Sequence, residues 1–181
     1  LNTMENTLVQ TKAVIGSDFN TAPSPEHIAH TVENLKARGF EPIMVNTGAE
    51  AFEKIKALIP AGASVMNGSS ATLQQIGFID HLKGGMHGWN NLHDAILAEK
   101  DPVKQALLRK QSVVSDYFLS SVQAITEEGQ IIVTNATGSS FPSLSYTSQN
   151  VILVVSTKKI MPTLESAMAL IHEHVFPHAD K

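Results

Sequence analysis

Short apolar runs alternate with helical stripes through the first half of the chain. Ser24-Pro25-Glu26 supplies an N-cap, a first-turn proline and an early acid, and apolar residues then recur at helical spacing until Gly39. The pattern next predicts a strand at 42–45, a helix at 51–59, a strand at 63–66, and a helix that begins near Ala71 with Ser69 or Ser70 as its N-cap. This alternation indicates a mostly parallel sheet.

The second half of the chain extends the same pattern. Residues 81–91 contain three glycines and the only tryptophan, Trp89, and are interpreted as a loop or lid. A helix is predicted from Asp101-Pro102, with Val103, Ala106, Leu107 and Val114 facing inward. A strand ending near Ile125 follows, and strands at 131–134 and 151–155 complete the sheet. The last predicted helix follows Pro162, with Leu164, Met168, Ile171 and Val175 on its apolar face. The polar residues 1–23 are treated as a segment that precedes a single domain at 24–181.

Composition and charge narrow the choice of partners. The chain has 181 residues, 43% hydrophobic and 17% charged, with a formal net charge of -4, so neither a basic face nor a nucleic-acid partner is expected. No apolar segment approaches the ~20 residues of a membrane span, and the N-terminus does not resemble a secretory signal. We therefore expect a cytoplasmic protein without a membrane partner.

Cysteine is absent from the chain, and arginine occurs only at Arg38 and Arg109. The first fact excludes disulfides and any metal or iron–sulfur cofactor held through cysteine. The second predicts that an anionic ligand is held by backbone amides, hydroxyls and lysines.

Two polar loops follow predicted strands. In Asn67-Gly68-Ser69-Ser70, amides and hydroxyls converge at a helix start, where a phosphate or carboxylate can bind, although an ordinary helix cap has the same pattern. In the second loop, Asn135, Thr137 and Ser139 offer side chains and Gly138 allows close backbone approach, whereas a plain polar connector to Pro142 is the alternative. Together the two loops predict a small-anion site.

The histidines give a weaker metal hypothesis. His81, His87 and His93, with Asp80 and Asp94, offer nitrogen and oxygen ligands, but spacings of six match no short ligand motif. No metal site is therefore assigned.

Several segments together resemble one family. These are Asn67–Gly77, Asp116-Tyr-Phe-Leu, Ser121–Val133 with its acidic glycine turn, Asn135–Ser140, and the run Val151–Val155 leading to Lys158-Lys159. They resemble the lactate-utilization (LUD) domain family, in particular its cysteine-free lactate utilization protein C type. The resemblance covers roughly residues 40 to 175. It implies a three-layer α/β/α sandwich of the NagB/RpiA/CoA-transferase-like group, with a mostly parallel central sheet.

The resemblance adds candidate site residues. It extends the first loop to Thr72 and favours Lys159 over Lys158 as a ligand-binding lysine at the end of a parallel strand. CoA-transferase-like enzymes use a glutamate nucleophile, for which Glu127 is the candidate, and Asp116 is a candidate base. A solvated hairpin turn and a helix-end acid are the respective alternatives. Some family members carry Arg directly after the glycine that corresponds to Gly138, where this chain has Ser139.

The resemblance implies a role in lactate utilization, the oxidation of L-lactate to pyruvate. The expected ligand is a small organic anion or phosphorylated metabolite, and iron–sulfur proteins and a second copy of the chain are expected partners. Two alternatives remain open: a free-standing sugar-phosphate isomerase or CoA-transferase-like enzyme, and a non-catalytic metabolite sensor or assembly module.

Overall fold

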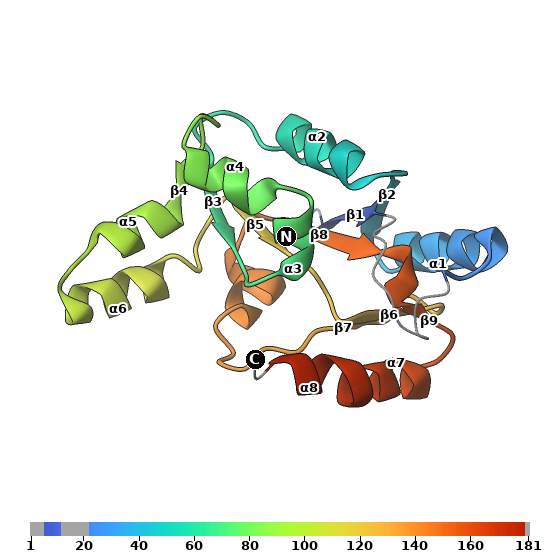
Figure 1. Ribbon diagram of the computed structural model, residues 1–181. Coiled ribbons are helices and arrows are strands. Elements are labelled where there is room, and N and C mark those ends of the chain that lie inside the picture. Colours follow the sequence, from blue (N-terminus) through green and yellow to red (C-terminus); the bar gives the residue numbers. More distant parts are fainter. Residues whose placement is uncertain (1–5, 12–21, 180–181) are drawn as a thin grey trace.

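The computed structural model describes residues 6–11 and 22–179 and has a six-stranded sheet at its centre (Figure 1). The strand order is β2-β1-β8-β5-β3-β4, and every pairing is parallel. These strands are β1 (Asn6–Thr11), β2 (Phe40–Met44), β3 (Ser64–Asn67), β4 (Asn90–Asn91), β5 (Tyr117–Ser120) and β8 (Asn150–Ser156). The predicted parallel sheet is confirmed.

Helices connect the strands and follow the last of them. They are α1 (Pro25–Ala37), α2 (Gly48–Leu58), α3 (Ala71–Gln75), α4 (Phe78–Gly84), α5 (Leu92–Ala98), α6 (Pro102–Gln111), α7 (Leu164–Leu170) and α8 (Phe176–Ala179), with π-helical turns η1 (Ser143–Thr147) and η3 (Ile171–Val175) and a 3-10 turn η2 (Thr157–Lys159). Ser24 caps α1 and Ser70 caps α3 through their side chains, as the sequence predicts.

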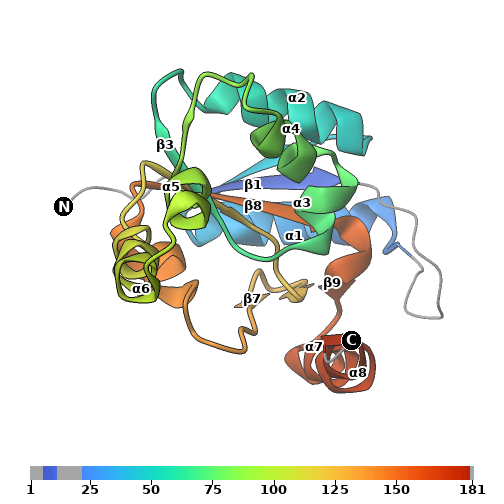
Figure 2. The same ribbon diagram turned by 60° about the vertical axis from the view of Figure 1, so that its left-hand side comes forward.

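Strand β8 shows how the layers form. Its side chains alternate between the two faces of the sheet. Ile152 and Val154 pack with Ile55 of α2 on one face, whereas Val151, Leu153 and Val155 pack with Leu35 of α1 on the other. Figure 2 shows α2 and α4 above the sheet and α1 below it. The fold is therefore a three-layer α/β/α arrangement.

A second, three-stranded sheet lies beside the first, with the order β7-β6-β9. It consists of β6 (Ala124–Thr126), β7 (Ile131–Ile132) and β9 (Ile160–Met161). The predicted strands at 125 and 131–134 therefore do not complete the central sheet, because Ser120 ends β5 and the chain turns away before β6. Strands β6 and β7 form an antiparallel hairpin whose turn uses Gly129 at φ 78°.

The loop or lid predicted at 81–91 is correct only for the irregular backbone at 85–89. Helix α4 continues through Gly84, because Phe78 and Leu82 bury against the core. Trp89 then stacks on His87 at 5.2 Å and donates its indole N–H to the Ile59 carbonyl at 3.1 Å. The segment is thus held against the body of the protein.

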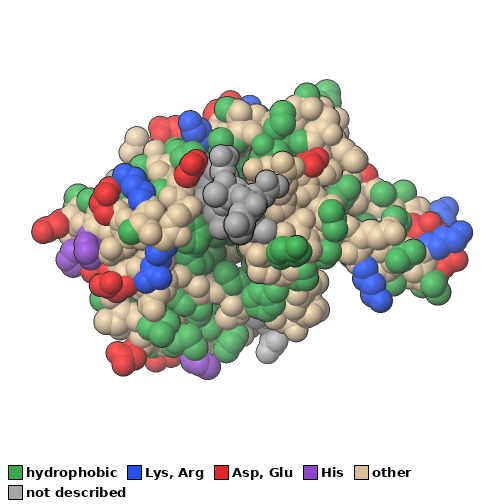
Figure 3. All heavy atoms as spheres, turned by 180° about the vertical axis from the view of Figure 1, so that it is seen from behind, with side chains coloured by type: hydrophobic (Ala, Val, Ile, Leu, Met, Phe, Trp, Pro, Cys, Tyr) green, Lys and Arg blue, Asp and Glu red, His purple; other side chains and the backbone are tan. Residues whose placement is uncertain are grey.

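Two predicted apolar faces differ from the structure. Val103 and Leu107 of α6 are exposed by 79% and 54%, and Val114, which follows the helix, by 67%, because α5 and α6 form a hairpin that projects from the sheet (Figure 1). Figure 3, seen from behind, shows this projection with Lys and Arg side chains on its surface. On the last helix, Ala167 and Ile171 bury, while Leu164 and Met168 are exposed.

The N-terminal segment contains a strand that the sequence does not reveal. Strand β1 pairs with both β2 and β8. Residues 1–5 and 12–21 of the segment lie outside the described residues. Within the described ranges, no helix is both long and apolar enough to cross a bilayer.

The histidines beside Trp89 predict that the stability of the protein depends on pH. Burial, and then the neighbouring His87 and Lys56, lower the pKa of His81 below its ordinary value of 6.5. As the pH drops from 6.5, His81 binds a proton more readily in the unfolded chain than in the folded protein. The free energy of unfolding should therefore fall over this pH range. Urea unfolding of the wild type and of His81→Gln at pH 5 and pH 8 measures this contribution. We expect a smaller pH difference in the variant; an equal difference in both proteins would assign the effect to other groups.

Candidate functional site

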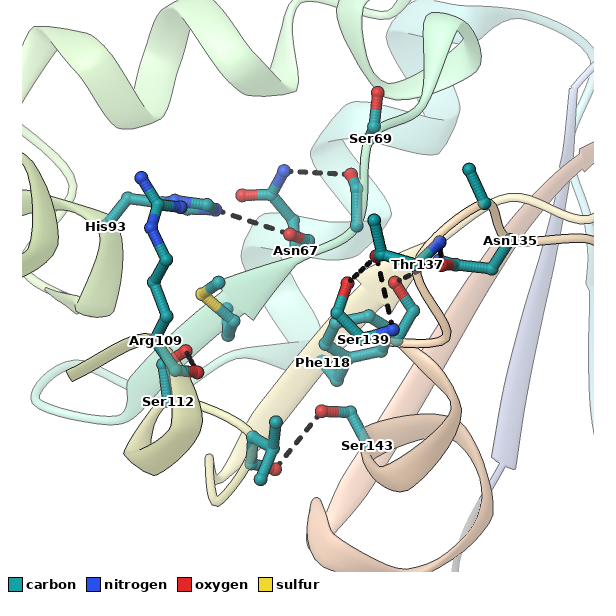
Figure 4. A pocket seen from close by; sticks show the side chains of 15 residues that line it. Asn67, Ser69, His93, Arg109, Ser112, Phe118, Asn135, Thr137, Ser139 and Ser143 are labelled. Atoms are coloured by element: carbon teal, nitrogen blue, oxygen red, sulfur yellow. Dashed lines mark hydrogen bonds between the residues drawn. The ribbon is translucent and has the colours of Figure 1, made fainter. Parts of the chain in front are cut away.

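A cavity of about 400 Å³ lies at the carboxyl end of β3, and both polar and apolar residues line it. Ligands of open α/β sheets bind at this edge. The cavity lies between three parts of the chain: the loop after β3, the loop 135–140, and the α5–α6 hairpin. Figure 4 shows Asn67 and Ser69 from the first, Asn135, Thr137 and Ser139 from the second, and His93 and Arg109 from the third.

The loop after β3 is held close to its neighbours. The Gly68 amide donates to the Leu119 carbonyl at 2.9 Å, and the Asn67 side-chain amide donates to the Gly68 carbonyl at 3.0 Å. A Cβ atom on Gly68 would lie 3.1 Å from the Ser120 hydroxyl and 3.3 Å from the Ser140 hydroxyl. A side chain at position 68 would therefore crowd both hydroxyls where the two loops approach each other.

The second loop, residues 135–140, is held by hydrogen bonds between its own residues. The Asn135 side chain accepts from the Thr137 amide at 3.0 Å and donates to the Ser140 hydroxyl at 2.9 Å, and the Thr137 hydroxyl donates to the Ser139 hydroxyl at 2.8 Å. Gly138 has φ 72°, which shapes the turn, and is not among the cavity-lining residues. Because the Thr137 amide is already bonded, the side chains of this loop, more than its amides, are available to a ligand.

Sequence reasoning missed Arg109 and did not place His93 at this site. Arg109 lies on α6 and lines the cavity, and its guanidinium makes no ion pair or hydrogen bond to any described residue. The His93 ring contacts the Asn67 carbonyl at 3.3 Å. No acidic side chain is among the described residues that line the cavity, so its electrostatic character favours an anion. Arg109 therefore joins the hydroxyls and amides as a group that could contact a ligand in this cavity.

The proposed metal ligands are not together. The rings of His81 and His87 lie 5.7 Å apart beside Trp89, whereas His93 lies at the cavity. In the part of the chain that the structure describes, no group of three His, Asp or Glu side chains is arranged to hold a metal ion.

A cluster of polar side chains lies near the cavity, just after the ends of β5 and β8. The ammonium of Lys159 donates to the Ser121 hydroxyl at 2.9 Å and to the Val122 carbonyl at 2.7 Å. The Ser121 hydroxyl is also 3.2 Å from that of Thr72. Burial lowers the pKa of Lys159 to about 8. Two of the sequence candidates, Thr72 and Lys159, are thus joined by Ser121, which sequence reasoning did not single out.

Neither acidic candidate lies at the cavity. The Glu127 carboxylate pairs with His27 of α1 at 3.1 Å, and the Glu127 carbonyl accepts from Asn34. Asp116 precedes β5, so it lies at the opposite end of that strand, where its carboxylate accepts from the Ser64 amide at 2.7 Å and the Ser64 hydroxyl at 2.8 Å. The structure thus gives both acids partners away from the two polar loops.

Together the fold and the cavity define an α/β protein with a cavity beside a parallel sheet, in which no described lining residue is acidic. Residues 28–181 match the model of the LUD domain family, and the chain belongs to this family. Neither the search of curated proteins nor the search of solved structures gave a match.

Proposed function

We propose that the protein binds a small organic anion in the cavity and contributes in this way to lactate utilization, the oxidation of L-lactate to pyruvate. The observation that carries the proposal is the position of Arg109 at a cavity whose described lining residues include no acid. Membership of the LUD domain family supports the assignment to lactate metabolism. The volume of about 400 Å³ falls within the range of small-molecule sites.

The lining residues suit a hydroxy or oxo acid. A guanidinium can hold a carboxylate through two parallel hydrogen bonds. The hydroxyls of Ser69, Thr137 and Ser139 can each donate to or accept from the hydroxyl or carbonyl oxygen of such an acid. The cavity is therefore suited to recognising both functional groups of lactate or pyruvate.

Electron transfer would require another protein. The chain has no cysteine, and cysteine thiolates are the usual ligands of iron–sulfur clusters. We therefore propose that the protein serves as an anion-binding subunit or partner of iron–sulfur proteins. Copurification of an iron–sulfur protein with the tagged chain from its native cells, lost in high salt, is the expected result.

Replacing Arg109 with glutamine should weaken anion binding. A hydrogen bond to a charged group contributes about 1.5–3 kcal/mol, so the dissociation constant for L-lactate or pyruvate should rise roughly 10- to 100-fold. Isothermal titration calorimetry measures this change directly. Lys104→Gln is the matched control, because Lys104 lies on the same helix and does not line the cavity.

Thermal unfolding with different ligands also tests the isomerase and transferase alternatives. Stabilisation by L-lactate or pyruvate in thermal unfolding supports the proposal, because a ligand at ~100 times its dissociation constant adds about 2.7 kcal/mol of stability. Stabilisation only by sugar phosphates or CoA thioesters would replace the proposal with the isomerase or transferase alternative. Equal affinity of the Arg109→Gln and Lys104→Gln variants would remove Arg109 from the site.

A further inference from the structure

The cluster of Lys159, Ser121 and Thr72 has the geometry of an activated hydroxyl. The Lys159 nitrogen lies 2.9 Å from the Ser121 oxygen, within the distance over which a base accepts a proton. Thr72 is 7% exposed, and its hydroxyl lies 3.2 Å from the same oxygen. Two residues from separate segments, Lys159 and Thr72, thus converge on the Ser121 oxygen.

A purely structural role explains this lysine poorly. A buried ammonium is normally paired with a carboxylate, because removing an unpaired charge from water is costly. Here the described partners of the Lys159 nitrogen are a hydroxyl and a carbonyl, and no described carboxylate lies within ion-pair distance. Perturbed groups of this kind cluster at functional sites.

The same environment makes the lysine usable as a base. With a pKa of about 8, about a tenth of the Lys159 side chains carry a free amine at neutral pH, far more than for an ordinary lysine. A free amine has a lone pair that can accept the Ser121 proton. Hydroxyl nucleophiles activated by a neighbouring lysine occur among hydrolytic enzymes.

The cluster is also close to the cavity. Ser121 follows Ser120, whose hydroxyl lies 3.1 Å from the Cβ position of Gly68, a cavity-lining residue. Ser121 itself is half-buried, and its hydroxyl also lies 3.3 Å from the Val122 carbonyl. The cluster therefore adjoins the cavity through Ser120 and Gly68.

We propose that Ser121 is an acyl-accepting nucleophile, with Lys159 as its base and Thr72 as a positioning residue, and that it reacts with activated carboxylic esters such as thioesters or aryl esters. The Ser121 oxygen bonds to the ester carbonyl carbon, and the bond from that carbon to the thiolate or phenolate leaving group breaks. The Ser121 proton moves to the Lys159 nitrogen and from there to the leaving group. Water then attacks the acyl-serine, gives a proton to Lys159, and releases the acid as that proton returns to Ser121.

The test uses the full chain with p-nitrophenyl acetate and a fluorophosphonate probe. We expect peptide mass mapping to place the covalent group on Ser121, and the rate of nitrophenolate release to rise with pH around a midpoint near 8. Ser121→Ala should abolish the labelling. Lys159→Met should slow release roughly 100-fold or more, because a positioned base contributes about 10²–10⁴.

Two further variants separate chemistry from structure. Lys158→Met changes the adjacent lysine and should leave the rate and the pH profile unchanged. Thr72→Val should slow release while Thr72→Ser restores it, because the second variant keeps the hydroxyl. Added methylamine should raise nitrophenolate release by Lys159→Ala by more than it does in a solution without protein, a rescue that a lysine with only a structural role would not give.

Several results would overturn the proposal. Acylation of Lys159 itself, or labelling spread over other residues with Ser121 unmodified in the folded wild type, would each exclude Ser121 as the nucleophile. The same holds for an unchanged rate in a folded Ser121→Ala variant. The mapping on the wild type is decisive even where a variant fails to fold.

Discussion

Replacing Asp116 with alanine is expected to lower the free energy of unfolding by about 2–4 kcal/mol and to leave anion binding by the folded protein unchanged. The Asp116 carboxylate accepts from both the amide and the hydroxyl of Ser64, at 2.7 and 2.8 Å, and the Ser64 hydroxyl accepts in turn from the Asp116 amide at 2.8 Å. The substitution removes two charged hydrogen bonds and leaves the Ser64 amide without this acceptor. Urea unfolding and calorimetry with the same anions measure the two effects.

The Ser64→Ala variant and the double variant complete this test. If the acid acts through Ser64, the two single losses should not add, because they remove parts of one network. Asp116→Asn should lie between wild type and alanine, since an amide oxygen can still accept. A loss of anion binding or turnover with unchanged stability would return Asp116 to the role of a base.

Local signals predicted much of the fold. The Ser24-Pro25-Glu26 start of α1, the stripe of α2 and the Ser70 cap of α3 are patterns that depend on neighbours within one or two turns. The apolar run of β8 was equally clear, because a strand buried on both faces has no polar alternation. Such elements can be identified without knowledge of their partners.

Elements defined by distant partners were not predictable. Strand β1 contains only Leu8 and Val9 as apolar residues, so it lacks the apolar run expected of a strand between two others. Strand β6 looks like a continuation of β5, but its partners are β7 and β9. The apolar residues of α6 resemble a buried stripe, yet the helix projects from the sheet.

The site also contains residues that the sequence could predict and residues that it could not. Asn67, Ser69 and Asn135 could be proposed from sequence, because a polar loop after a predicted strand marks the carboxyl edge of a parallel sheet. No sequence pattern identifies Arg109 as a site residue, since a basic residue in the last turn of a helix is common. Ser121 gains significance only from the nearby Lys159, which is 38 positions away in the chain.

Replacing Gly129 with alanine is expected to destabilise the protein by about 2–4 kcal/mol. Gly129 has φ 78°, which an alanine adopts only under strain, and an added Cβ would lie 3.0 Å from the backbone carbon of Asn34 and 3.2 Å from the Arg38 side chain. The β6–β7 turn would therefore have to move away from α1. Chemical unfolding monitored by circular dichroism measures the loss.

Gly62→Ala separates the two causes of this loss. Gly62 has φ 83° but nothing within 4 Å of its Cβ position, so only the backbone strain, about 1–2 kcal/mol, should remain. The excess in Gly129→Ala then measures how tightly α1 holds the turn that carries Glu127. If the two variants lose equal stability, α1 does not constrain this turn, and the Glu127 carboxylate is freer to leave His27 than its 3.1 Å contact indicates. A clear excess means that α1 fixes the turn and that Glu127 stays beside His27, away from the cavity.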